Sequence, residues 1–278
     1  MILYISRATS YKIYNRLFTE GVLVGGYQAQ KFNYNIITGL AKYCEVISLA
    51  SLPYGEISCP AIEESVEQVS YYCVKNKKGK LHKFNNIVEL IRQGKKLIKK
   101  HKIRYIICDA IALAPSFAAL KLGKKYHIPV IGIITDIPET MHSDKLSFWG
   151  KLNAKIMKKY DAYVLLTEAM NGIVNPMNKP YVVMEGACGD FPEMREKQEK
   201  RIIVYSGSLW AKDAGLEYFT EGFIKANLPN TELHFYGTGA FMEVLKGLEQ
   251  QYPQIQYKGC ITNEEMVKRQ TEAMLLIN

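Results

Sequence analysis

The chain has 278 residues, 48% hydrophobic and 23% charged, which is enough to bury a sizeable core in one large or two ordinary domains. No apolar stretch approaches the length of a membrane span, and the N-terminus lacks the basic start and cleavage site of a signal peptide, so we expect a cytoplasmic protein. The six cysteines are scattered without a close pair, which argues against a disulfide framework and a zinc site and fits a reducing compartment.

The net charge of +9 is unevenly distributed along the chain. Residues 1–195 hold 27 Lys and Arg against 16 Asp and Glu, whereas residues 196–278 hold 9 against 11. A basic surface of this kind suits nucleic acid, anionic lipid or phosphorylated substrates. Because the sequence has no zinc finger, RNA-recognition signature or basic zipper, we do not expect nucleic acid as a partner.

Short apolar runs alternate with helical patterns along the chain, which predicts a parallel sheet covered on both faces. The predicted strands of the first part are residues 2–6, 46–50, 70–74, 105–108, 129–134, 162–166 and 181–184. Helices are predicted over residues 27–43, 85–101 and 144–160.

The polar stretch 191–200 is the best candidate for a domain boundary, so we assign one domain to residues 1–195 and a second to 196–278. The strands predicted for the second domain are residues 202–206, 232–236, 254–257 and 273–277. Both domains open with a strand, a glycine turn and a helix, as doubly wound α/β domains do.

The first glycine turn contains Gly25 and Gly26 and ends a loop of about 20 residues that starts at Arg7. Loops of this length are uncommon in compact domains unless they are functional. Glycines at a helix start let the backbone approach a diphosphate closely. An ordinary turn is an equally good interpretation.

The second turn, GSLWAKDAG, contains Ser208, whose hydroxyl can donate to a phosphate, and Lys212 near the helix start. Lys212 can neutralise negative charge that develops on a leaving phosphate. The alternative is a surface lysine beside a helix cap, which the residues alone favour.

Asp136, in the segment TDIPE, follows the most apolar strand of the chain. Ligands bind at the carboxyl ends of such strands, so Asp136 is a candidate for holding a sugar hydroxyl or assisting proton transfer. It can equally cap the next helix.

Gly237, Gly239 and Gly259 follow predicted strands of the second domain. Their open backbone can line a nucleobase and a ribose, or simply form turns at the strand ends.

One predicted helix carries basic residues opposite its apolar stripe: Arg92, Lys95, Lys96, Lys99 and Lys100. Such a face can dock on an anionic membrane, although charged helix faces are more often only solvated.

Taken in order, the segments MILYIS, Gly25-Gly26, TDIPE, YVVMEGACGD, IVYSGSLWAKDAG, LHFYGTGAF and IQYKGCITNEEM resemble the retaining glycosyltransferases of family 4. The resemblance covers essentially the whole chain and is closest to members that build bacterial capsule, exopolysaccharide or O-antigen. It implies a GT-B fold, in which two Rossmann-like domains face each other across a cleft. It also implies a nucleotide-diphospho-sugar donor and a lipid-linked saccharide acceptor.

The resemblance also implies roles for individual residues. Gly25 and Gly26 match the glycine pair that approaches the donor diphosphate, and Lys212 matches the lysine that binds it. Ser208 stands where the family has an arginine, which is a departure. Asp136 lies in the loop near the transferred sugar. The nucleobase side of the pocket is matched by Gly237, Gly239 and the backbone around Cys260.

No metal or other cofactor is expected, because the sequence contains no Asp-x-Asp cluster. The family also carries two glutamates, seven residues apart, just after the strand that matches residues 273–277. This sequence ends at Asn278, before them. We therefore expect an incomplete second domain and no sugar transfer at a useful rate by this chain.

Two other functions remain open at the level of the sequence. One is a nucleotide-sugar epimerase of the same fold, and the other is an inactive binding or scaffold protein of a polysaccharide assembly complex.

Overall fold

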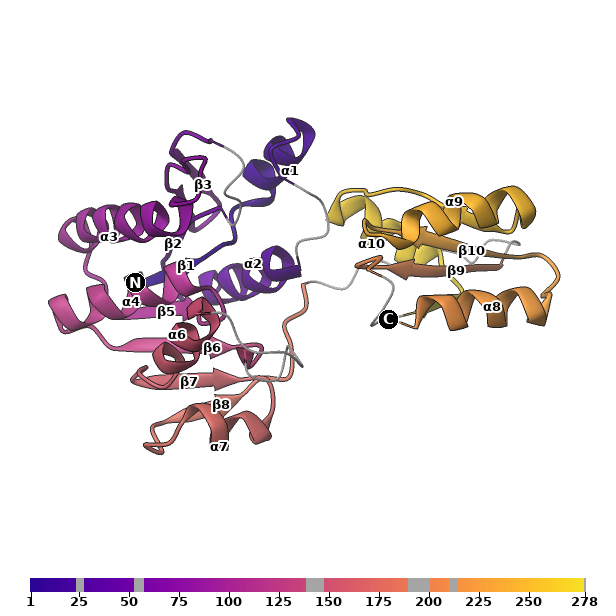
Figure 1. Cartoon of the computed structure of the whole chain (residues 1–278). Helices are drawn as coiled ribbons and strands as arrows, with labels where there is room; N and C mark the ends of the chain where they lie inside the picture. Colours follow the sequence, from indigo (N-terminus) through magenta and orange to yellow (C-terminus); the bar gives the residue numbers. More distant parts are fainter. Residues whose placement is uncertain (24–27, 53–57, 139–147, 190–200, 211–214, 278) are drawn as a thin grey trace. The chain divides into compact units, whose positions relative to one another are not determined.

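The computed structural model describes residues 1–23, 28–52, 58–138, 148–189, 201–210 and 215–277. The chain divides into two compact units: Met1–Arg16 with Gln28–Gly189, and Leu17–Tyr27 with Asp190–Asn278 (Figure 1). The predicted boundary between residues 195 and 196 lies outside the described residues and stays a prediction. The assignment of residues 17–27 to the second unit was not predicted.

The first unit is built on an eight-stranded sheet in the order β3-β4-β2-β1-β5-β6-β7-β8. Its strands are β1 (Ile2–Ser6), β2 (Val46–Ala50), β3 (Ile62–Val66), β4 (Val69–Cys73), β5 (Tyr105–Asp109), β6 (Val130–Ile134), β7 (Ala162–Leu165) and β8 (Tyr181–Val183). All neighbouring strands are parallel except β3, which pairs antiparallel with β4.

Helices cover both faces of this sheet, and the alternation of side chains along β1 shows how. Leu3 and Ile5 join the core that also contains Leu90 and Leu122 from the helices of one face. Tyr4 points to the opposite face and bonds Asn33 of α2. Helix α1 (Tyr11–Thr19) begins in this unit and ends in the segment assigned to the second. The other helices described in this unit are α2 (Gln28–Ala41), α3 (His82–Lys100), α4 (Leu113–Tyr126), α6 (Phe148–Met157) and α7 (Asn171–Val174), with a short 3-10 turn at Glu168–Met170.

Several elements were not predicted from the sequence: helices α1, α4 and α7 and strand β3. The described part of the predicted loop, residues 7–23, is not extended, because it contains helix α1. The first turn of α1 is capped by the Ser10 hydroxyl, which accepts from the Ile13 N–H at 3.1 Å. Strand β3 was missed because its sequence, IEESV, is polar and exposed at every second residue. A sheet edge needs no continuous apolar run, so such strands escape a search for buried ones.

The second unit holds a four-stranded parallel sheet in the order β11-β10-β9-β12. Its strands are β9 (Arg201–Ser206), β10 (Thr231–Tyr236), β11 (Ile255–Tyr257) and β12 (Leu275–Ile277), and its helices are α8 (Leu216–Ala226), α9 (Phe241–Gln251) and α10 (Asn263–Glu272). One face, with Ile203, Phe235 and Leu233, packs against α8 and α9.

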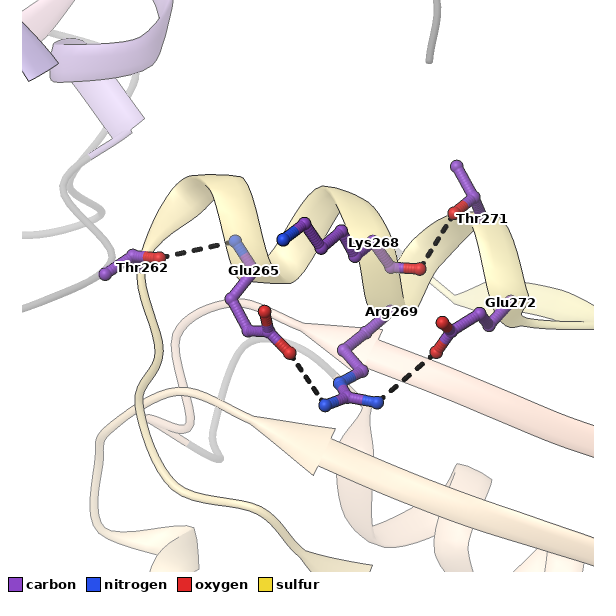
Figure 2. A network of polar contacts seen from close by, with 6 residues as sticks. All are labelled: Thr262, Glu265, Lys268, Arg269, Thr271 and Glu272. Carbon is purple, nitrogen blue, oxygen red and sulfur yellow. Dashed lines mark hydrogen bonds and ion pairs between the residues drawn. The ribbon is translucent and has the colours of Figure 1, made fainter. Parts of the chain in front are cut away.

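The other face of the second sheet faces α10. Figure 2 shows Arg269 of α10 between Glu265 and Glu272, with ion pairs of 2.7 and 3.3 Å. The Thr262 hydroxyl caps the helix by accepting from the Glu265 N–H. A pocket of about 320 Å³ lies here, lined by strand residues such as Val204 and Tyr236.

Candidate functional site

The strand order places a topological switch point at β1, which has β2 on one side and β5 on the other. From β1 the chain crosses to β2, whereas from β5 it crosses to β6 in the opposite direction. Between the carboxyl ends of β1 and β5 this leaves a crevice, which is where α/β proteins bind ligands. Three polar residues stand at this edge: Arg7 directly after β1, Asp109 at the end of β5 and Asp136 just beyond β6.

Asp109 is the centre of a buried polar chain that runs across the sheet. Its side chain is only 2% exposed. Its Oδ1 accepts from the Ile111 N–H and its Oδ2 from the Nδ2 of Asn33, both at 3.3 Å. The Oδ1 of Asn33 in turn accepts from the Tyr4 hydroxyl at 2.6 Å. Side chains from β1, α2 and β5 are thereby fixed in one network.

Burial raises the pKa of the Asp109 carboxyl, because a carboxylate loses its hydration there. The Arg7 guanidinium and the hydrogen bonds from Ile111 and Asn33 lower it in part, and the charge of Asp136 raises it further. Burying a carboxyl at a switch point costs hydration free energy. Carboxyl groups with a pKa shifted in this way are typical of functional sites.

The backbone between β1 and α1 is also held in place. The amide of Gln30 on α2 pairs with the backbone of Thr9 through two bonds, accepting from its N–H at 2.9 Å and donating to its carbonyl at 2.7 Å. The Ser6 hydroxyl accepts from the Ala8 N–H at 3.0 Å. Arg7 therefore leaves β1 on a fixed stretch of chain.

Asp136 is exposed, whereas Ile137 and Pro138 behind it are buried. Its charge acts on Asp109, so the structure brings this sequence-predicted residue to the same edge as Asp109 and Arg7. Gly25, Gly26 and Lys212 lie outside the described residues, and their roles stay predictions.

The second unit repeats the arrangement with β9 at the switch point between β10 and β12. Here two backbone hydrogen bonds join the loop after β9 to the end of β10 and the loop that follows it. The Gly207 N–H donates to the Tyr236 carbonyl, and the Leu209 N–H donates to the Thr238 carbonyl. Ser208 is exposed between these two bonds, and its carbonyl accepts from the Tyr205 hydroxyl at 2.8 Å.

Gly237 and Gly239 allow this close approach. Gly237 has a φ of 139°, and a Cβ there would lie 1.8 Å from the carbonyl oxygen of Gly207. A Cβ on Gly239 would lie 2.2 Å from the carbonyl carbon of Leu209. Both glycines are therefore needed to pack two loops of the protein against each other, whatever they also offer to a ligand.

The third loop of this edge carries Gly259 and Cys260. The Gly259 carbonyl accepts from the Gly237 N–H at 3.0 Å, which ties the loop to its neighbour. Cys260 is partly buried, and burial raises the pKa of its thiol. The structure thus brings Ser208, Gly237, Gly239 and the segment at Cys260 to the carboxyl ends of three adjacent strands.

The basic helix predicted from the sequence is α3. Arg92, Lys96, Lys99 and Lys100 are exposed, and Lys95 is partly so. Arg92 donates to Glu89 at 2.6 Å, so one of the five positive charges is paired within the helix.

Within the described ranges, no three His, Cys, Asp or Glu side chains gather as metal ligands. The predicted independence from metal stays a prediction. In the same part of the chain, no helix is both long and apolar enough to cross a bilayer.

Arg7, Asn33 and Asp109 were not predicted as site residues from the sequence. Asp109 could have been predicted, because it directly follows the apolar run YIIC, just as Asp136 follows a buried strand. Asn33 gives no such signal, because only the packing of α2 on the sheet places it beside Tyr4 and Asp109.

No protein-family model matches the sequence, and no curated protein matches it either. Solved structures do match. Sucrose-phosphate synthase from Thermosynechococcus elongatus superposes with a TM-score of 0.67 at 12% identity, over 99% of this chain and 74% of its own. The lipopolysaccharide outer core galactosyltransferase WaaB gives a TM-score of 0.58 at 11% identity, over 99% of this chain and 72% of that one.

Anabaena HepE, solved in complex with UDP and glucose, matches with a TM-score of 0.57 at 9% identity, over 99% of this chain and 73% of its own. These similarities, together with the two switch-point sheets, define the class: the chain has the α/β fold of GT-B glycosyltransferases. The expected fold is confirmed. At such low identity the likeness shows the fold alone.

Proposed function

We propose that this protein is a glycosyltransferase that moves a hexose from a nucleotide diphosphate sugar to a hydroxyl of a lipid-linked saccharide, with retention of the anomeric configuration. The observation that supports it best is the polar edge of the first unit. There Arg7, Asp109 and Asp136 converge at a switch point, in a fold shared with sucrose-phosphate synthase and WaaB.

In this proposal the second unit binds the nucleotide. The open backbone at Gly237, Gly239 and Cys260 lines the nucleobase and ribose. Ser208 and Lys212 bind the diphosphate, and Gly25 and Gly26 approach it by their backbone. Lys212 stabilises the negative charge of the leaving group.

The first unit contributes the polar edge. Asp136, which is exposed, binds a hydroxyl of the transferred sugar or assists proton transfer from the acceptor. Asp109 is a positioning residue in this scheme, because it contacts Asn33 and acts on Arg7 from a buried position.

During transfer, the bond between the anomeric carbon and the diphosphate oxygen breaks, and its electron pair leaves with the diphosphate. The acceptor oxygen forms the new bond on the same face, and its proton passes to an oxygen of the departing diphosphate. Catalysis rests on positioning and on electrostatic stabilisation, and no metal or covalent intermediate is invoked.

We further propose that the protein acts in bacterial polysaccharide biosynthesis as a family-4 enzyme, peripheral to the inner face of the plasma membrane, with α3 toward the lipid. A lipid-linked acceptor lies at that surface, and the exposed lysines of α3 suit anionic head groups.

The test is a product assay with a panel of nucleotide sugars, with and without lipid-linked saccharide extracted from bacterial membranes. We expect release of nucleoside diphosphate only when acceptor is present. We also expect the sugar in the product to have the same anomeric configuration as in the donor. Release of an epimer or free sugar without acceptor would favour an epimerase. Donor binding without any turnover would favour a scaffold protein.

A further inference from the structure

Five lysines gather at the carboxyl edge of the first sheet, where the chain leaves β4 and enters α3. We call them the lysine cluster: Lys75, Lys77, Lys78, Lys80 and Lys83. All five are exposed, and no Asp or Glu occurs from residue 68 to residue 88. Because these positive charges have no acidic neighbour along the chain, their fields add to one another and attract an anion.

The loop that carries most of the cluster is held in place by a neighbouring segment. Cys59 and Asn76 exchange two backbone hydrogen bonds, of 3.0 and 2.9 Å. The Lys78 N–H donates to the Ser58 hydroxyl at 3.1 Å. The lysines therefore project from a backbone that is fixed at two points, which lowers the entropy cost of ordering them around a ligand.

Apolar side chains lie among these lysines. Leu81, Phe84 and Val88 follow one another at spacings of three and four residues, so they share one side of the start of α3. They are 70%, 61% and 45% exposed. Lys80 and Lys83 directly precede Leu81 and Phe84 in the chain. Charge and apolar surface therefore alternate here from one side chain to the next.

The register of the sheet places the cluster near the polar edge of the first unit. Cys73 of β4 pairs with Ala50 of β2, and Ala50 pairs with Ser6 of β1. Arg7 follows Ser6, and Lys75 follows Cys73 by two residues. Neighbouring strands lie about 4.8 Å apart, so β4 and β1 are about 10 Å apart along this edge. A short oligosaccharide spans that distance.

We infer that the lysine cluster binds an acidic saccharide, whose carboxylates or phosphates pair with the lysines while Leu81 and Phe84 pack on its sugar rings. A sugar ring carries its charges and hydroxyls at the rim and C–H groups on its faces. This is the mixture of charge and apolar surface that the cluster offers.

This inference rests on the proposed function and narrows its acceptor to an acidic saccharide. The charged sugars lie on the lysine cluster, and the reacting hydroxyl lies at the polar edge with Arg7, Asp109 and Asp136.

A bilayer and a nucleic acid fit these residues less well. Inserting Leu81 and Phe84 among acyl chains would draw Lys80 and Lys83 after them, and a lysine in the acyl layer is costly. Single-stranded nucleic acid binds along a series of aromatic rings on which successive bases stack. Residues 75–88 contain one Phe and no Tyr or Trp.

The test measures binding of labelled oligosaccharides to the protein by fluorescence anisotropy. One probe is hexagalacturonate, which has a carboxylate on every sugar, and its matched control is the methyl ester of the same oligomer, which has none. Phosphorylated pentamannose tests phosphate as the source of charge. We expect an acidic probe to bind at least about tenfold more tightly than the methyl ester, and to weaken as salt is raised.

Two variants with the same loss of charge locate the site. The first is Lys77→Gln, Lys78→Gln, Lys80→Gln and Lys83→Gln. It should raise the Kd for the acidic probe about 10–100-fold, because four exposed ion pairs are lost. The control, at the other end of α3, is Lys95→Gln, Lys96→Gln, Lys99→Gln and Lys100→Gln. These lysines lie about 18 Å or more along the helix from Lys83, beyond the Debye length of about 8 Å, so the Kd should change less than about threefold.

Phe84→Ala separates contact with the sugar rings from attraction to charge. Loss of the ring should raise the Kd for the acidic saccharide about 3–10-fold. Inorganic polyphosphate is a polyanion without sugar rings. It should bind the Phe84→Ala variant as it binds the parent, and bind the lysine-cluster variant more weakly. Thermal unfolding checks that each variant is folded.

The inference is overturned if the two lysine variants bind the acidic saccharide equally, because the attraction then comes from net charge alone. It is also overturned if the methyl ester binds as tightly as the acid. Tighter binding of anionic vesicles or single-stranded RNA than of either acidic saccharide, lost in the lysine-cluster variant, would assign the cluster to that partner instead.

The outcome can be told apart from that of the proposed function, because no binding measurement needs a nucleotide sugar or turnover. Transfer to a neutral acceptor only would overturn the inference and leave the proposed transfer standing. Saccharide binding at the cluster without any transfer would support the inferred site and count against the proposed transfer.

Discussion

At the scale of single residues, Asp109 is the clearest sign that the polar edge of the first unit is used. An ionised carboxylate there is desolvated and only partly compensated by Arg7, Asn33 and Ile111. An apolar or neutral residue would be easier to bury at the same place. The chain keeps an acid at the carboxyl end of a central strand, where ligands bind.

This leads to a prediction on stability. Because the pKa of Asp109 is raised on folding, its ionised form destabilises the fold, and the penalty grows as the pH rises through that pKa. Asp109→Asn should therefore raise the melting temperature at pH 8 and give a smaller gain near pH 4. Unfolding followed by Trp149 fluorescence, in the Trp210→Phe background, reports on the first unit. A melting temperature lowered at pH 8 would show that the carboxylate stabilises the fold.

Lys212 carries the prediction on catalysis. In a version of the protein that turns over a nucleotide sugar, Lys212→Ala should lower kcat/KM by roughly 10–100-fold, because a charged hydrogen bond of about 1.5–3 kcal/mol is lost. Steady-state kinetics measure this, with Lys225→Ala on the exposed face of α8 as the control. A change below about threefold would mean that Lys212 is a surface residue.

Gly237 carries a prediction on packing. Gly237→Ala should cost about 2–4 kcal/mol, because the backbone has a left-handed φ and the added Cβ would overlap the Gly207 carbonyl. Gly247→Ala is the matched control within α9, where nothing lies within 4 Å of an added Cβ, and it should stabilise by about 0.5–1 kcal/mol. Urea unfolding followed by Trp210 in the Trp149→Phe background distinguishes the two. Equal effects would contradict the close approach of the two loops.

At the scale of elements, the two faces of α3 differ: one packs in the core, and the other exposes lysines to solvent. Leu90, Gly94 and Leu97 are buried, and Gly94 lets the side chain of Leu122 come close. The lysines on the other side serve no contact in the core. Their charges remain available to a partner outside the protein.

Reversing Lys95, Lys96, Lys99 and Lys100 to Glu should abolish co-sedimentation with anionic liposomes and leave neutral liposomes unaffected, because each lysine contributes about 1 kcal/mol near such a surface. The helix should keep its fold, since none of the four is buried. Circular dichroism provides that check. Sedimentation equal to that of the parent would identify these lysines as a merely solvated face.

At the scale of the whole molecule, each unit has its own sheet and its own apolar core. Units with separate cores generally unfold as separate cooperative transitions. We therefore expect the single-tryptophan variants to report different urea midpoints, Trp149 for the first unit and Trp210 for the second. Coincident midpoints and slopes in both variants would indicate one cooperative unit.

The buried strands could be predicted from the sequence, whereas some elements at the edge of the sheet could not. Every strand expected from an apolar run is present within a residue or two. For the central strands the reason is that a strand buried on both faces must be apolar almost throughout. The edge strand β3 and the helix α1 lack that signature, since β3 is polar and α1 lies within a stretch read as a loop.

By itself, the sequence determined the alternation of strands and helices, the α/β class and the charge asymmetry between the two parts, because these depend on local periodicity and composition. It also pointed to strand ends such as Asp136 and Gly237. Only the tertiary structure decided that Asp109, Asn33 and Tyr4 form one buried chain, and that Gly237 packs on Gly207. These contacts join residues up to 76 positions apart, and such partners are fixed by the order of strands in the sheet, which no local pattern encodes.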